Sequence, residues 1–168
     1  MLVWDNESGI GQHRRRVGVS GGELVMGEDR VSVGAWWEPA TWVRARSAYV
    51  WDLDHEPAAP AGFIEWLHWV LEEHVARGPE GRAELGIATR ATIGADEGLN
   101  RHHRLRVGTL AAVDQAVVAD RRAGRILSRS AWIHEAVTAA IADAERRAGT
   151  LPTIPADVRL PNRPNKAS

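Results

Sequence analysis

The 168-residue chain contains no cysteine. This absence excludes disulfides, thiol nucleophiles and cysteine-based zinc or iron–sulfur sites, and it favours a reducing, cytoplasmic location. No apolar run approaches the roughly 20 residues that a membrane helix needs. The first residues, MLVWDNESGIGQ, also lack the basic and apolar regions of a signal peptide. We therefore expect a soluble cytoplasmic protein that does not contact a membrane.

Phenylalanine and tyrosine are scarce, with one of each, whereas tryptophan occurs eight times. Seven of the eight tryptophans lie before residue 70. A buried tryptophan contributes a large apolar area but needs a hydrogen-bond acceptor for its indole N–H. We expect most of them to pack in a core, because large apolar residues are usually buried. The alternative is that they form a contact surface for a protein partner.

The net charge of −1 hides an uneven distribution of charge along the chain. Residues 1–98 hold 9 arginines against 16 aspartates and glutamates, a net charge of −7. Residues 99–149 hold 9 arginines against 5 acidic residues, a net charge of +4, and residues 150–168 carry +2. A difference in sign of this kind indicates an anionic partner for the second part of the chain.

The first part of the chain shows two strand-like pieces and one clear helix. Residues 31–33 and 41–46 alternate apolar or small side chains with polar ones, which is typical of strands. Apolar side chains at helical spacing then predict a helix over residues 63–74, which Gly78 and Pro79 end. Glycines interrupt residues 80–99, so we interpret them as a linker with one short helical turn at most. The acidic residues 52–56 are expected to form a solvated turn.

The second part has a clearer pattern. Residues 101–107 are rich in arginine and histidine and are expected to form a strand. Apolar residues at spacings of three and four predict a helix over residues 110–121 and a second one that starts at the N-cap Ser128 and closes at Gly149. The proline-containing segment that follows is expected to be extended or disordered.

One strand with two helices cannot bury its apolar faces, and a lone strand leaves a row of backbone groups unsatisfied. Two copies would solve both problems if their strands paired antiparallel across a two-fold axis. We therefore predict an obligate homodimer. Such a two-stranded ribbon fits the major groove of double-stranded DNA, where outward side chains reach base edges.

This order of elements resembles the ribbon-helix-helix DNA-binding family of Arc, MetJ and CopG type. The most specific match is ILSRSAWIHEAV at residues 126–137, which is similar to the family's turn and second-helix start, and LAAVD at residues 110–114 is similar to its first helix. The resemblance covers residues 100–146 and implies that strand side chains read bases while the Ser-basic-Ser segment holds phosphate. Carried over by position, it identifies the candidate DNA-binding residues Arg101, His102, Arg104, Arg106, Ser128, Arg129 and Ser130.

The strand differs from the family pattern, because Gly108 and Thr109 come directly before the helix. Strict alignment from the helices places Asn100, His102 and Arg104 outward and leaves Arg101 and a histidine facing the core. A slip of one residue would invert every side chain, so the sequence leaves the register open.

The expected fold is mainly α with a short β-ribbon. We divide the chain into an acidic, Trp-rich region at 1–98, which is small α+β or partly disordered, a ribbon-helix-helix domain at 99–149 and a Pro-rich tail at 150–168. The expected function is sequence-specific DNA binding by a dimer, as a transcriptional repressor or as a centromere-binding protein of plasmid partition. The alternatives are an antitoxin that binds its toxin through residues 1–98, and a protein-interaction module without DNA activity.

An enzymatic function is suggested only by residues 2–11, LVWDNESGIG, which resemble the strand that carries a catalytic aspartate in DDE-type transposases, matched at Asp5. Two-metal phosphoryl transfer needs further carboxylates on other strands, and the sequence shows no such strands. We therefore expect a transposase-derived remnant at most, and we expect no enzyme activity, catalytic residue, metal or cofactor.

Overall fold

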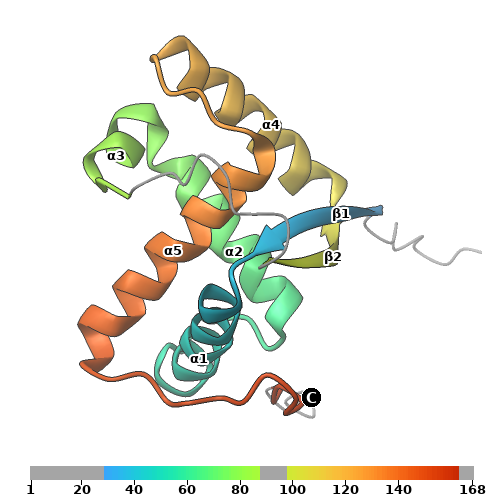
Figure 1. The fold of residues 1–168 in the computed structure, drawn as a ribbon, viewed down its shortest axis with the longest axis vertical. Coiled ribbons are helices and arrows are strands. Elements are labelled where there is room, and N and C mark those ends of the chain that lie inside the picture. Colours follow the sequence, from blue (N-terminus) through green and yellow to red (C-terminus); the bar gives the residue numbers. More distant parts are fainter. Residues whose placement is uncertain (1–28, 88–97, 163–168) are drawn as a thin grey trace, which may run out of the picture.

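The structure is a computed structural model that describes residues 29–87 and 98–162 (Figure 1). The resemblance at residues 2–11 therefore lies outside the described residues. The elements in chain order are β1 (Arg30–Trp37), α1 (Pro39–His55), α2 (Phe63–Ala76), α3 (Gly78–Glu84), β2 (Leu99–Arg106), α4 (Val107–Arg122) and α5 (Arg129–Ala148). The fold is thus mainly helical with a small antiparallel sheet, which confirms the coarse prediction of fold class.

The basic strand is present, but its partner is in the same chain. β2 pairs antiparallel with β1 in a register that runs from Arg30 opposite Arg106 to Trp37 opposite Leu99. The prediction that this strand must pair with a second copy is therefore wrong. The backbone groups of β2 that would have needed another chain are instead hydrogen-bonded to a strand about seventy residues earlier in the same chain. The sequence contains no signal for this pairing.

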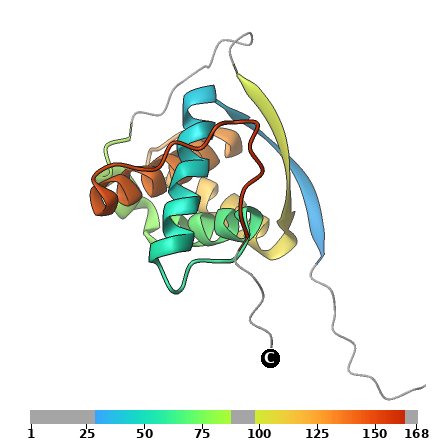
Figure 2. The same ribbon diagram turned by 90° about the horizontal axis from the view of Figure 1, so that it is seen from below.

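The two strands form a ribbon along one side of the molecule, and the helices cover its inner face (Figure 2). The inner face alternates regularly, because Val33, Ala35 and Trp37 of β1 and Leu105 of β2 are all buried. These side chains join buried residues of α1, α2, α4 and α5 in one hydrophobic core. The described parts of the regions before and after residue 98 therefore share a single core.

The chain folds as two similar strand–helix–helix units. Pro39 opens α1 after the single residue Glu38 that follows β1, and Val107 opens α4 directly after β2, an offset of 68 residues (107 − 39). At this offset Asp52 corresponds to Asp120, and both aspartates are buried. The helices interlock, since α1 packs mainly on α5, α2 packs on α4, and α5 and α2 contact the strands of the opposite units.

The strand expected at residues 41–46 is instead part of α1. Its short alternation of apolar and polar residues also fits a helix, and Pro39 at the first helical turn favours one. Burial follows helical spacing, since Trp42, Ala45 and Tyr49 all face the core. The acidic segment expected to be a solvated turn is largely the end of the same helix, and its Asp52 is buried.

The other helices are present where the sequence predicts them, although α4 begins earlier than expected, so that Val107, expected in the strand, and Gly108 and Thr109, expected before the helix, all lie in it. The prediction for residues 63–74 is confirmed by α2, but α3 follows it as a seven-residue helix from Gly78, which is longer than the single turn expected in this region. Ser128 caps α5, because its Oγ accepts a hydrogen bond from the backbone N–H of Ala131 at 3.1 Å. Gly149 closes α5 with φ of +72°, a left-handed conformation that favours glycine. Within residues 29–87 and 98–162, every helix is too short or too polar to cross a lipid bilayer.

The described part of the tail forms no helix or strand, turns at residues 155–158 and docks on α1. Buried Arg46 donates hydrogen bonds to the carbonyl oxygens of Pro155 at 2.9 Å and Ala156 at 3.0 Å, and also to that of Val158. Tyr49 adds a hydrogen bond from its hydroxyl to the carbonyl oxygen of Pro161 at 2.7 Å. One buried guanidinium therefore holds a segment that has no secondary structure of its own.

Replacing Arg46 with alanine is expected to release the tail and to lower the free energy of unfolding by about 1.5–3 kcal/mol, because hydrogen bonds to a charged group are lost. Arg44 is the control, since it forms an exposed ion pair with Glu145, and Arg44→Ala should cost less than about 1 kcal/mol. Urea denaturation gives both values, and limited proteolysis reports cleavage in the tail. Equal losses for the two variants, with an intact tail, would contradict the prediction.

Candidate nucleic-acid interface

The outer face of the ribbon is one continuous exposed surface. Its side chains come alternately from the two strands: Ser32, Gly34 and Trp36 from β1, and Asn100, His102 and Arg104 from β2. The structure thus has the register in which Asn100, His102 and Arg104 point outward. This is the register that strict alignment from the helices predicts, and its polar inner face has a structural explanation.

Arg101 and His103 face inward and are both accommodated there. The Arg101 guanidinium carbon lies 4.3 Å from the centroid of the Trp42 ring, a cation–π contact. Trp37 donates from its indole N–H to Nε2 of His103 at 3.1 Å. Aromatic partners therefore allow a basic side chain and an imidazole to occupy inner-face positions, and Arg101 is not available to read bases from the outer face.

Burial lowers the pKa of His103 to about 4, and the neighbouring charges of Arg101 and His102 act in the same direction. The unfolded chain binds a proton at this histidine near pH 6.5, whereas the folded chain resists protonation until about pH 4. Stability is therefore expected to fall as the pH drops from 6.5 to 4, by about 2–3 kcal/mol from this group. Urea denaturation at pH 7.5 and pH 5 measures the change.

His103→Gln is the matched variant, because its amide oxygen can still accept from Trp37 but does not titrate. Its stability should depend less on pH than that of the wild type. Burial also lowers the pKa values of His68 and His74, so a smaller dependence of the same sign should remain. An identical pH dependence in wild type and variant would show that His103 is not the titrating group.

His102 and Arg104 form the polar centre of the outer face. His102 lies across the ladder over Gly34, where an added Cβ would be 3.5 Å from its Cε1, and its Nδ1 is 3.5 Å from the Ser32 hydroxyl. Arg104 is exposed and has no ion-pair partner among the residues that the structure describes. A shallow hollow at this end of the ribbon is lined by both side chains. Arg104 is thus an accessible cation on the ribbon.

Arg106 is directed toward α2 instead. Its Nε is 2.9 Å from Nδ1 of His68, its backbone N–H donates to Nε2 of the same histidine at 3.1 Å, and it forms an ion pair with Glu65 at 3.4 Å. Arg30, opposite Arg106 in the ladder, also pairs with Glu65, at 2.6 Å. Of the four strand residues that the sequence analysis singled out, only His102 and Arg104 therefore lie on the outer face.

The Ser-Arg-Ser segment lies at the far end of the ribbon, at the start of α5. The backbone N–H of Trp36 donates to the Ser130 hydroxyl at 3.3 Å, so this helix start sits against the edge of β1. Arg129 forms an ion pair with Asp114 at 2.6 Å, and both side chains are about half exposed. Of the three candidate phosphate-binding residues, Ser130 contacts the ribbon directly, and all three already have a partner within the chain.

A buried ionic network connects the helices. Arg82 of α3 binds Asp120 of α4, with Nη2 2.9 Å from Oδ1, and also donates to the carbonyl oxygen of His74 at 3.0 Å. Trp132 of α5 donates to the other oxygen of Asp120 at 2.9 Å. The side chains of the four residues are all at most 2% exposed: Arg82, Asp120, Trp132 and His74. The network therefore links four helices without contact with solvent.

Glu135 extends this network toward Arg125. His74 lies 3.0 Å from one oxygen of Glu135, and Arg125 donates to both oxygens. Burial alone would raise the pKa of Glu135, but the hydrogen bonds from His74 and Arg125 outweigh it and lower the pKa. Sequence reasoning missed the network, because an acidic residue inside a helical stripe gives no sign of its partner. The indole N–H groups that need acceptors were the one available signal.

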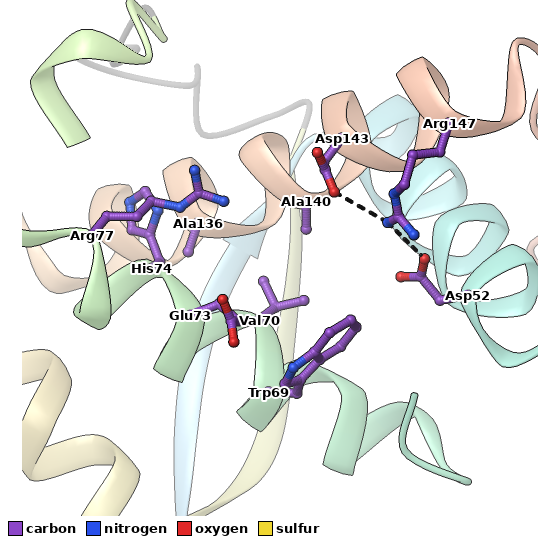
Figure 3. Close-up of a pocket in the computed structure, with 10 residues that line it drawn as sticks. All are labelled: Asp52, Trp69, Val70, Glu73, His74, Arg77, Ala136, Ala140, Asp143 and Arg147. Carbon is purple, nitrogen blue, oxygen red and sulfur yellow. Dashed lines mark hydrogen bonds and ion pairs between the residues drawn. The ribbon is translucent and has the colours of Figure 1, made fainter. Parts of the chain in front are cut away.

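A cleft between α2 and α5 is another concave feature (Figure 3). It is lined by Val70 and Ala136, and its empty volume is about 460 Å³, including the part open to solvent. At one end Arg147 lies 3.0 Å from Asp52 and 3.2 Å from Asp143, so these charges are already paired. Burial raises the pKa of Asp52 despite the opposing effects of Trp66 and Arg147. The Arg147–Asp52 pair joins α5 to α1, which gives this end of the cleft a role in the fold.

The described residues contain no group of three or more histidine, aspartate or glutamate side chains placed to hold a metal ion. The ribbon face therefore stands as the candidate site on its shape and its exposed basic and polar groups. The chain matches no protein-family model, and comparison with curated proteins and with solved structures gave no significant match either.

Proposed function

We propose that the outer face of the ribbon binds the major groove of double-stranded DNA and that the chain is a single-chain form of the ribbon-helix-helix arrangement. The observation that carries the proposal is the row of outward side chains Asn100, His102 and Arg104 on a two-stranded antiparallel ribbon. A ribbon of this kind fits the major groove, and arginine and asparagine there recognise guanine and adenine by paired hydrogen bonds.

The two interlocked units support the comparison with the family. A ribbon-helix-helix dimer takes one strand and two helices from each chain, whereas here both sets follow one another in a single chain. The helices hold the inner face of the ribbon, so the outer side chains project from a rigid support. This rigidity favours base readout over a purely electrostatic contact.

The start of α5 would anchor the DNA backbone beside the ribbon. Backbone N–H groups and the dipole at a helix N-terminus attract phosphate, and Ser128, Arg129 and Ser130 lie there. Arg129 would exchange Asp114 for a phosphate. This exchange is inexpensive, because an exposed ion pair contributes only about 0–1 kcal/mol.

In the cell, sequence-specific binding of this kind would serve repression of transcription or centromere recognition in plasmid partition in the cytoplasm. Both uses share the same molecular event. Selection of genomic fragments with the purified chain separates them, since the bound site would lie either at a promoter or at a repeated partition locus.

The direct test compares Arg104→Ala with Arg122→Ala in DNA titrations followed by fluorescence anisotropy. Arg104→Ala should lower the affinity for the selected site about 5- to 150-fold and relax the preference for one base pair. Arg122 is an exposed arginine in the last turn of α4, which leads away from the ribbon (Figure 1), so its replacement should have little effect.

Arg129→Ala should weaken selected and scrambled duplexes about equally and reduce the slope of log affinity against log salt by about 1, because one phosphate contact is lost. Equal behaviour of Arg104→Ala and Arg122→Ala on selected and scrambled DNA would contradict the proposal. All three variants should first show the wild-type circular dichroism spectrum.

A further inference from the structure

We infer that one copy of the chain reads an asymmetric DNA segment, with the base-reading groups supplied almost entirely by β2. This inference rests on the proposed function and adds the symmetry of its target. It follows from a comparison of the two strands at equivalent positions.

The offset of 68 residues that relates the two units also relates their outward side chains. At this offset Ser32 is equivalent in sequence to Asn100, Gly34 to His102 and Trp36 to Arg104. β2 thus offers an amide, an imidazole and a guanidinium, whereas the corresponding positions of β1 offer a hydroxyl, no side chain and an indole. Hydrogen bonding to base edges is therefore concentrated on one strand.

The space on the face is also divided unequally. The His102 ring lies over Gly34, and a Cβ at residue 34 would stand 3.4 Å from Oδ1 of Asn100 as well. β2 side chains therefore lean across the ladder and occupy area above β1. A Cβ at residue 34 would be in ordinary van der Waals contact with both side chains, so the surface above Gly34 is already covered by side chains of β2.

The two helix starts next to the ends of the ribbon also differ from each other. At the Trp36 end, α5 begins with a side-chain cap from Ser128 and with Arg129 beside it. At the Arg106 end, α2 begins after Gly62, which gives no side-chain cap, and carries Glu65 in its first turn. A carboxylate repels phosphate, although Glu65 is itself paired with Arg30 and Arg106. A side-chain cap and a first-turn arginine therefore lie at one end of the ribbon, and a first-turn carboxylate lies at the other.

The spacing of the β2 side chains predicts what is read. Asn100 and Arg104 are four residues apart, which is roughly 13 Å along a strand and about four base-pair steps at 3.4 Å each. Arginine is best matched to guanine and asparagine to adenine. The expected site has a guanine and an adenine about four base pairs apart, with His102 over the bases between them, and has no two-fold symmetry.

The test is selection from randomised duplexes with the full chain, followed by native mass spectrometry of the complex and anisotropy titrations. We expect a motif that differs from its reverse complement, bound by one chain per duplex. Arg104→Ala should lower discrimination at one base pair about 5- to 150-fold. Ser32→Ala, at the ladder position opposite Arg104, should change it by no more than about twofold.

A palindromic motif bound by two chains would overturn the inference and leave the proposed DNA binding intact. A single bound chain with equal losses for Ser32→Ala and Arg104→Ala would also overturn it, because both strands would then read bases. The absence of any enriched sequence, with no salt-dependent binding, would overturn the proposed function itself. Circular dichroism and thermal unfolding establish that both variants are folded.

Discussion

Arg82→Met is expected to lower the free energy of unfolding by about 3–5 kcal/mol, the loss typical of removing one partner of a buried ion pair. Arg82 is 2% exposed, binds Asp120 with two nitrogens, and also donates to two backbone carbonyls at the end of α2. Methionine keeps much of the side-chain volume but leaves the carboxylate of Asp120 with less compensation. Urea denaturation followed by circular dichroism measures the loss.

Two further variants identify the source of this loss. In Arg82→Met with Asp120→Leu both charges are absent, so we expect the double variant to recover part of the stability lost by the single one. Arg77→Met replaces an exposed arginine on the neighbouring turn and should change stability by less than about 1 kcal/mol. A loss below about 1 kcal/mol for Arg82→Met would show that the Asp120 carboxylate does not depend on Arg82.

Trp66→Ala is expected to cost a similar amount, about 3–5 kcal/mol, because the largest fully buried side chain of α2 is lost from the core. Trp66 is fully buried, lies 5.6 Å from Phe63 and 6.1 Å from Tyr49 between ring centroids, and donates its indole N–H to Asp52 at 2.8 Å. Differential scanning calorimetry and urea denaturation both report the change.

Trp66→Phe separates packing from hydrogen bonding. Phenylalanine keeps an aromatic ring in the site but removes the donor to Asp52, so a smaller loss of about 1–3 kcal/mol is expected. Burial already raises the pKa of Asp52, and the indole N–H opposes that rise, so the variant should raise this pKa further. Carboxyl titration by NMR checks the direction. Equal losses for the alanine and phenylalanine variants would show that packing contributes little at this position.

The helices could be predicted from sequence because their signals are local. Ser128 and Gly149 mark the two ends of α5 by their own backbone chemistry, whatever the rest of the chain does. The pairing of β1 with β2 has no local signal, since any two strands with alternating faces could pair. The similarity of the two units is equally hidden, because at the offset of 68 residues few positions are identical, among them Asp52 and Asp120.

Only part of the candidate interface could be predicted, again because sequence patterns report local structure. Alternation placed His102 and Arg104 together on one face, and that much is observed. It could not show that Arg106, at the last position of β2, turns toward Glu65, or that Arg101 would find an aromatic ring to cover it. Both outcomes depend on side chains from helices distant in sequence, which periodicity does not report.

The internal pairing of the ribbon has a consequence for how the chain folds as it is made. β1 leaves the ribosome well before the strand that completes it, because paired residues are separated by 62 positions at Trp37 and Leu99 and by 76 at Arg30 and Arg106. Its apolar inner face and open edge must wait for that distant partner, and closing so long a loop slows folding. Translation speed and chaperone supply should therefore affect the yield of this protein more than that of a helical bundle of equal length with short-range contacts.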